Sequence, residues 1–301
     1  MVGPPGLGSA MRVEEVCERL WPGRGARVER LGGGLTNHNF KVSVGEEAFV
    51  VRVAGDDTDL LGIDRADEHG AALVAASIGV GPEVVGYVDG SLVTRFVAGT
   101  PVPPDEISSP ATVARVAGLL RTIHEGPPVP GRFDSFRVVE AYLETVLARG
   151  QPAPERYADA KAHADEIESA LGARPERPCH NDLLNANFIA DGDRLWIVDW
   201  EYAGMGDPFF DLANFAVNNG LDEDGDRALL DAYGRPGEQS LARLTLMRFM
   251  SDFREAMWGA VQHAVSALDV DFAAYSGEHF ERLEATAGSD RFRAALDAVR
   301  G

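Results

Sequence analysis

The sequence predicts an α+β fold in two lobes: a small antiparallel β-sheet lobe with one main helix, and a larger, mostly helical lobe. Short apolar runs separated by Gly-containing turns fill residues 27–97, a pattern typical of antiparallel strands. A Gly- and Pro-rich stretch follows at residues 98–104, and apolar residues then recur mainly with helical spacing. We therefore predict an N-terminal lobe at residues 1–97 and a C-terminal lobe at residues 98–301.

The N-terminal lobe begins with a predicted helix at residues 11–20, where three apolar residues share one face. Its main helix is predicted at residues 64–78. Asp64 is the expected N-cap, because an aspartate at that position accepts hydrogen bonds from free backbone N–H groups. The strands of this lobe are predicted at residues 27–31, 40–44, 48–54, 83–88 and 92–97.

The C-terminal lobe begins with a helix at Ser109 and Pro110, a capping residue followed by a residue suited to the first turn. Val113, Val116 and Leu120 then form an apolar stripe. Further helices are predicted at residues 136–148, 155–171, 226–233, 238–264 and 271–285.

The composition restricts the partners that we expect. The formal net charge is -20, which argues against a nucleic-acid partner and suits a cationic substrate, although acidic surfaces often serve solubility alone. No apolar run approaches membrane-spanning length, so we expect no membrane partner. Cys17 and Cys179 cannot form a disulfide framework, and residues 1–10 lack a signal-peptide pattern. We therefore expect a cytoplasmic protein, and the sequence indicates no oligomeric state.

Three polar residues lie around a predicted hairpin at residues 188–200. Asp182 and Asn187 precede it and Asp199 comes at the end of its second strand, so the hairpin folds Asp199 back toward the other two. Phosphoryl transfer needs a carboxylate that orients the attacking hydroxyl, and oxygen ligands for Mg²⁺. We assign Asp182 as the base and Asn187 and Asp199 as metal ligands. The alternative is that all three are only turn formers.

This segment resembles the choline/ethanolamine kinase family of the aminoglycoside phosphotransferase superfamily. Residues 180–182, His-Asn-Asp, stand where protein kinases carry His-Arg-Asp. Residues 199–202, Asp-Trp-Glu-Tyr, resemble the metal-binding segment of choline kinases. The resemblance covers nearly the whole chain. It implies a protein-kinase-like bilobal fold, ATP and Mg²⁺ as cofactors, a small-molecule substrate, and a supporting role for His180 and Asp211.

The nucleotide-binding residues are predicted mainly in the N-terminal lobe. Backbone N–H groups of a Gly-rich turn can approach phosphates closely, although such a turn by itself is also typical of a flexible loop. The resemblance favours phosphate contact and places adenine near the end of the last strand. It also pairs Arg52 with Glu68, which alone would be typical of a solvated helix face. The predicted residues are Gly33, Gly34, Thr36, Asn37, Arg52, Glu68, Arg95, Phe96 and Val97.

The substrate prediction depends on aromatic residues, because a quaternary ammonium group is recognised by ring faces. The resemblance places Trp258 and Tyr202 in an aromatic cage, with Trp200 and Tyr275 as weaker candidates, although such aromatic residues are also typical of a core. Glu255 stands where the family often has a second tryptophan and could attract a cation, even a primary ammonium. We predict choline as the substrate, with ethanolamine or another amino alcohol as the alternative.

Two other interpretations stay open. An aminoglycoside kinase of the same superfamily would need a broad acidic groove in place of a compact aromatic site. A catalytically inactive nucleotide-binding regulator is disfavoured because such proteins usually lose one of the three residues Asp182, Asn187 and Asp199, all of which are present.

Overall fold

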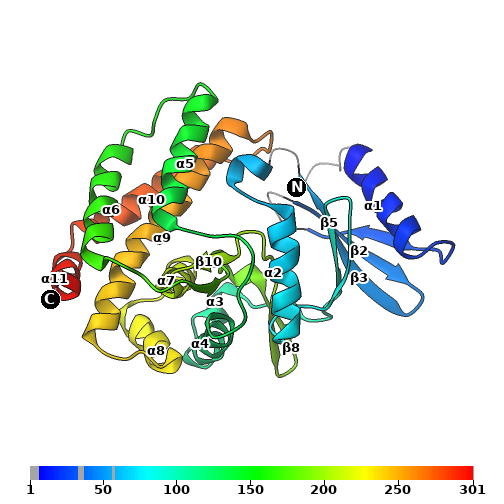
Figure 1. Ribbon diagram of the computed structural model, residues 1–301, viewed down its shortest axis with the longest axis horizontal. Coiled ribbons are helices and arrows are strands. Elements are labelled where there is room, and N and C mark those ends of the chain that lie inside the picture. The colour runs from blue at the N-terminus through cyan, green and yellow to red at the C-terminus, as the bar shows by residue number, and fades with distance from the viewer. Residues whose placement is uncertain (1–6, 33–36, 56–57, 301) are drawn as a thin grey trace.

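A five-stranded antiparallel sheet forms the smaller lobe of the protein (Figure 1). The computed structural model describes residues 7–32, 37–55 and 58–300. The strand order is β1-β2-β3-β5-β4, so the chain leaves the sheet after β3, forms a helix, and returns at the edge as β4. The strands are β1 (Arg27–Arg30), β2 (Asn37–Val44), β3 (Glu47–Ala54), β4 (Val84–Val88) and β5 (Ser91–Arg95).

Helix α2 (Arg65–Ser77) lies between this sheet and the helical lobe, and α1 (Leu7–Leu20) lies at the outer end of the sheet (Figure 1). Asp64 caps α2 as predicted. Its Oδ1 accepts hydrogen bonds from the backbone N–H groups of Ala66 at 2.7 Å and Asp67 at 3.2 Å. The cap sets where α2 begins, and so where the charged residues of its first turns point.

The larger lobe is built around α9 (Glu238–Val265), which is buried over most of its middle and packs against α5, α7, α10 and α11. The buried apolar residues form two clusters, one inside the sheet lobe and one that runs through the helices. The other helices are α3 (Pro104–Ile107), α4 (Pro110–His124), α5 (Ser135–Ala148), α6 (Tyr157–Leu171), α7 (Pro208–Asn218), α8 (Glu223–Tyr233), α10 (Phe272–Ala287) and α11 (Asp290–Arg300).

The predicted hairpin is formed by β8 (Phe188–Asp191) and β9 (Arg194–Ile197), with β6 (Thr100–Pro101) beside β8. The chain passes very close to β8 at Gly99, where a Cβ atom would lie 2.1 Å from the Ala190 carbonyl oxygen. Only glycine therefore fits at this connection. The remaining short elements are β7 (Arg177–Cys179), β10 (Gly204–Gly206), and the 3₁₀ turns η1 (Thr58–Leu61) and η2 (Asn185–Asn187).

The predicted α+β, protein-kinase-like bilobal fold is confirmed, but several element ends differ from prediction. Strand β2 begins at Asn37, so the chain is already paired there, whereas we expected a loop before residue 40. Strand β5 ends at Arg95 and β9 at Ile197, each before the apolar run ends. Helices α3 and α11 and the strands β6, β7 and β10 were not predicted. Within the part of the chain that the structure describes, no helix is long and apolar enough to cross a membrane.

Candidate active site

Residues 180–187, which we call the catalytic loop after their predicted role, bring Asp182 and Asn187 together. Asn187 ends the turn η2, and its Nδ2 donates to the Asp182 carbonyl oxygen at 2.8 Å and to Asp182 Oδ2 at 3.3 Å. Because the amide nitrogen makes both contacts, the amide oxygen of Asn187 is left to bind another group. The Asp182 side chain keeps 14% of its surface exposed, so a substrate can reach it.

Asp199 reaches the same place by way of the hairpin. The backbone N–H of Val198 donates to the Asn187 carbonyl at 3.0 Å. Asp199 lies two residues beyond the end of β9 and has a φ of 70°, while Asn181, next to the predicted base Asp182, has a φ of 67°. Non-glycine residues adopt this conformation at a cost, and such positions cluster at functional sites. Both strained residues therefore adjoin the predicted chemistry.

Arg52 connects Asp199 to helix α2. Its Nη1 donates to Glu68 Oε1 at 2.9 Å and also contacts Asp199 Oδ1. Burial disfavours the charge of Arg52, but the carboxylates of Asp199 and Glu68 outweigh this effect and raise its pKa. The ion pair expected between Arg52 and Glu68 is present, and it holds a permanent cation beside the two acidic residues.

A cavity of about 350 Å³ lies beside these residues and is lined by both Arg52 and Asp199. Residues 95–97, where adenine is expected, also line it. The N–H groups of the first two of these residues already donate to the carbonyls of Glu83 and Ala48, so a bound base would use other groups of the segment. Much of the remaining wall is apolar, and includes Leu31, Val50, Leu92, Ile189, Val198 and Trp200.

A second charged network, which the sequence did not predict, joins the two lobes. The Nδ2 of Asn37 donates to Glu201 Oε2 at 2.7 Å. Arg65 Nη1 donates to the same Glu201 oxygen at 3.2 Å and to Glu68 at 2.7 Å. Arg65 and Glu201 are 136 positions apart in the chain, and each resembles an ordinary surface charge when considered alone. The other predicted phosphate-loop residues lie outside the described residues: Gly33, Gly34 and Thr36.

Asp211 braces the catalytic loop from helix α7. It is fully buried and accepts the backbone N–H groups of His180 at 2.8 Å and Asn181 at 2.6 Å. The ring of His180 extends the brace, since its Nδ1 accepts from the Asp182 N–H at 3.2 Å and its Nε2 donates to the Val198 carbonyl at 3.0 Å. Burial lowers the pKa of His180, which favours the neutral ring with its single proton on Nε2, the nitrogen that donates to the Val198 carbonyl.

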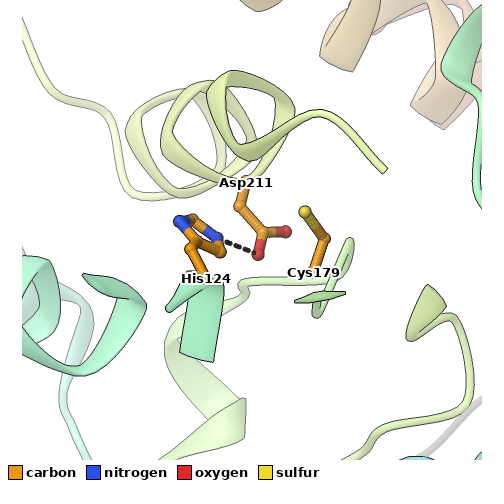
Figure 2. A group of neighbouring side chains, drawn as sticks. All are labelled: His124, Cys179 and Asp211. Carbon is orange, nitrogen blue, oxygen red and sulfur yellow. Dashed lines mark hydrogen bonds and ion pairs between the residues drawn. The ribbon is translucent and has the colours of Figure 1, made fainter. Parts of the chain in front are cut away.

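Figure 2 shows Asp211 with His124 and Cys179, three buried groups that could be mistaken for a metal site. His124 Nε2 donates to Asp211 Oδ2 at 3.0 Å, and His124 Nδ1 accepts from the Tyr233 hydroxyl at 2.8 Å. Both ring nitrogens and both carboxylate oxygens therefore already have hydrogen-bond partners. Asp211 and His124 are thus parts of a hydrogen-bonded support for the catalytic loop.

The other side of Asp182 faces helix α9. Arg254 Nη1 donates to Asp182 Oδ1 at 3.4 Å and to Glu255 Oε1 at 2.6 Å. Burial raises the pKa of Asp182 to about 7, and the positive charge of Arg254 opposes this rise. A carboxyl group that titrates near neutrality can both accept and release a proton. The geometry and the acidity of Asp182 thus both suit a general base.

The protein itself fills part of the predicted aromatic cage. The guanidinium carbon of Arg254 lies 4.4 Å from the centre of the Tyr202 ring, and the Tyr202 hydroxyl accepts from Trp258 Nε1 at 3.0 Å. Tyr275 donates its hydroxyl to Glu255 Oε2 at 2.9 Å and meets the Trp258 ring edge-on. One face of Tyr202 is therefore already occupied by a cation.

Trp200 lies away from this group. Its indole N–H donates to the Ile197 carbonyl at 3.1 Å, its ring packs edge-on against His180, and it lines the 350 Å³ cavity. The structure therefore places Trp200 at the wall of the 350 Å³ cavity, away from Trp258, whereas the sequence analysis grouped it with the substrate residues.

The donor set fits Mg²⁺. The carboxylate of Asp199 and the amide oxygen of Asn187 are hard oxygen ligands, and one or two such protein ligands suffice when phosphates and water complete the shell. The orientation of the Asn187 amide, set by its two contacts to Asp182, leaves the oxygen and not the nitrogen for the ion. Asp199 and Asn187 are therefore the residues that would hold it.

The fold and the site together define a kinase-like phosphotransferase. Residues 27–246 match the phosphotransferase enzyme family, and this match covers most of the chain, so the protein belongs to that family. The family match and the kinase-like fold place this protein among the ATP-dependent small-molecule kinases.

The chain is also similar to a solved structure from the choline/ethanolamine kinase family and to two further proteins. The structure of a choline/ethanolamine kinase family protein from Mesorhizobium loti is 32% identical with a TM-score of 0.83, over 98% of this chain and 99% of its own. Ethanolamine kinase 2 from Mus musculus is 26% identical over 92% of this chain and 80% of its own length. Protein LicA from Haemophilus influenzae is 27% identical over 67% of this chain, which spans only 61% of LicA.

Proposed function

We propose that this protein transfers the γ-phosphoryl group of ATP to the hydroxyl group of a small amino alcohol, with Mg²⁺ as cofactor. The observation that carries the proposal is the convergence of Asp182, Asn187 and Asp199, the last of which lines a cavity together with Arg52. Choline and ethanolamine are the first acceptors to test, because the similar proteins include kinases named for each. We further propose that residues 1–97 bind the nucleotide and residues 98–301 the acceptor.

In the proposed reaction, Asp182 accepts the proton of the acceptor hydroxyl. The hydroxyl oxygen forms a bond to the γ-phosphorus, the bond to the β–γ bridging oxygen breaks, and ADP leaves. Bound Mg²⁺, held by Asn187 and Asp199, would supply charge neutralisation at the phosphates. Arg52 contributes a second positive charge, and Asp211 keeps the base in position through the backbone of the catalytic loop.

The test is an acceptor panel with ATP and Mg²⁺, read by mass spectrometry of the phosphorylated product. The panel contains choline, ethanolamine, further amino alcohols and an aminoglycoside. Turnover of an amino alcohol that is lost with a chelator and in Asp182→Asn would support the proposal. ATP binding with no phosphorylated product from any acceptor would instead favour a nucleotide-binding regulator. Turnover of the aminoglycoside alone would refute the acceptor class.

The proposal also includes a cytoplasmic location. It is supported by the two cysteines, Cys17 and Cys179, which are both free and buried in the structure, as expected in a reducing compartment.

A further inference from the structure

Asn39 is a polar residue of strand β2 that lines the 350 Å³ cavity of the candidate active site. Its amide oxygen is buried and has no hydrogen-bond partner among the residues that the structure describes. The amide nitrogen makes no hydrogen bond there either, and it is not enclosed by protein. Asparagine is uncommon within strands, and polar groups at a protein interior almost always have partners. A molecule bound in the cavity can reach this side chain and supply the missing partner.

The strand register places Asn39 beside Arg52. The two residues are direct partners in the pairing of β2 with β3, so their side chains lie on the same face of the sheet. Leu92 of β5 pairs with Arg52 from the other side and also lines the cavity. Phe40, the next residue of β2, points to the opposite face and belongs to the buried cluster of the sheet lobe. Asn39 is thus the uncharged polar member of a row of residues that faces the cavity.

The position of this row along the sheet indicates which part of a nucleotide it meets. Val50 faces the cavity in the neighbouring row, on the side toward residues 95–97, where adenine is expected. The row of Asn39 and Arg52 lies two residues further along the strands, about 7 Å away. Arg52 is long and reaches Asp199, whereas the short side chain of Asn39 stays near the sheet. A nucleotide that spans from residues 95–97 to Asp199 therefore passes Asn39 with its middle part, the ribose and the first phosphate.

A ribose hydroxyl suits the amide of Asn39 better than a phosphate does. No described residue fixes the orientation of the amide plane, so either end can turn toward the ligand. A hydroxyl group can accept from Nδ2 or donate to Oδ1, whereas a phosphate oxygen can only accept. Resting on the function proposed above, we propose that Asn39 hydrogen-bonds a hydroxyl group of the ATP ribose. Asn39 is then a specificity-determining residue that selects ribonucleotides over deoxyribonucleotides.

The test compares ATP with 2′-deoxy-ATP and 3′-deoxy-ATP, each of which lacks one ribose hydroxyl. Calorimetry with Mg²⁺ present and no acceptor measures the affinity for each nucleotide. Asn39→Leu removes the amide at similar volume, and Asn39→Ala repeats the comparison with a side chain too small to crowd the strand. Ser43→Ala is the matched control, because Ser43 lies on the same strand and the same face as Asn39 but outside the cavity.

We expect the wild type to bind one of the two deoxynucleotides about 3- to 10-fold more weakly than ATP, the effect of one neutral hydrogen bond. Both Asn39 variants should lose affinity for ATP by a similar factor and no longer distinguish that deoxynucleotide from ATP. Ser43→Ala should keep the affinity and the distinction. A wild type that binds all three nucleotides equally would overturn the inference. An equal loss of affinity for all three in the Asn39 variants would also overturn it, because the amide would then contact a phosphate or the base.

The acceptor panel separates this inference from the proposed function. Selection of ribonucleotides that depends on Asn39, with no phosphorylated product from any acceptor, would support the inference and refute the function. Turnover of an amino alcohol at the same KM for ATP and both deoxynucleotides, in the wild type and in Asn39→Leu alike, would refute the inference and leave the function intact.

Discussion

Replacing Asp211 by asparagine tests how the catalytic loop is held. The carboxylate is fully buried, with Oδ1 accepting the Asn181 N–H at 2.6 Å and Oδ2 accepting the His180 N–H at 2.8 Å and His124 Nε2 at 3.0 Å. An asparagine has a single acceptor oxygen. Its best orientation keeps the two contacts at the Oδ2 position and turns an NH₂ group toward the N–H of Asn181.

The magnitude follows from these contacts. One charge-assisted hydrogen bond is lost, at about 1.5–3 kcal/mol, and two others become neutral, at about 1 kcal/mol each. Asp211→Asn should therefore lower the free energy of unfolding by about 3.5–5 kcal/mol, within the range for breaking a buried charged network. The assay is urea unfolding followed by tryptophan fluorescence, where we expect the midpoint to fall by about 1–2 M.

The matched control is Asp193→Asn in the exposed turn between β8 and β9, which should change stability by less than about 0.5 kcal/mol. Because the same contacts position Asp182, Asp211→Asn should also lower kcat at a temperature where the variant is folded. An Asp211→Asn protein that unfolds at the wild-type urea concentration and keeps wild-type kcat would refute the assignment of Asp211 as the brace.

Four further predictions follow from the site. Asp182→Asn should lower kcat by about 100- to 10,000-fold with little change in stability, and wild-type turnover would rule out Asp182 as the base. Arg52→Met should raise the KM for ATP by at least about 10-fold, since it removes the cation beside Asp199, and an unchanged KM would contradict this role. Gly99→Ala should destabilise the protein by about 1–3 kcal/mol in thermal unfolding, because the added Cβ meets the Ala190 carbonyl; a wild-type melting temperature would mean that the connection can shift. Burial raises the pKa of Cys179, so its thiol stays protonated at about pH 8 and iodoacetamide should label it only after unfolding, whereas labelling of the folded protein would disprove its burial.

The parts of the site that could be predicted are those whose geometry depends on residues that lie close together in the sequence. Asp182 and Asn187 lie five residues apart in one loop, and a tight hairpin turn is enough to return Asp199 toward them. The cap at Asp64 is similarly local, because it depends only on the N–H groups of Ala66 and Asp67, two and three positions further along the chain. The pairing of Arg52 with Glu68 is not local in this sense, and it came from the family resemblance.

The network of Asn37, Arg65 and Glu201 shows why the rest could not be predicted. Asn37 and Glu201 are 164 positions apart, and their hydrogen bond exists only because the two lobes close on each other. A polar residue after a Gly-rich turn and a charged residue in the first turn of a helix are both common on protein surfaces. Their burial is a property of the assembled fold, and neither hydropathy nor motif spacing encodes it.

The surroundings of Arg254 and Glu255 were the hardest part of the site to predict, for a reason that concerns helix α9. In sequence, the adjacent Arg254 and Glu255 resemble a solvated charge pair on a helix face. In the structure they lie on a helix that other helices surround, so their charges are strong, close to Asp182, and in need of partners. Glu255 finds those partners within the protein and Arg254 finds only some of them. Burial therefore turns a pair of charges that looks solvated in the sequence into part of the surroundings of Asp182, and neither hydropathy nor motif spacing encodes that change.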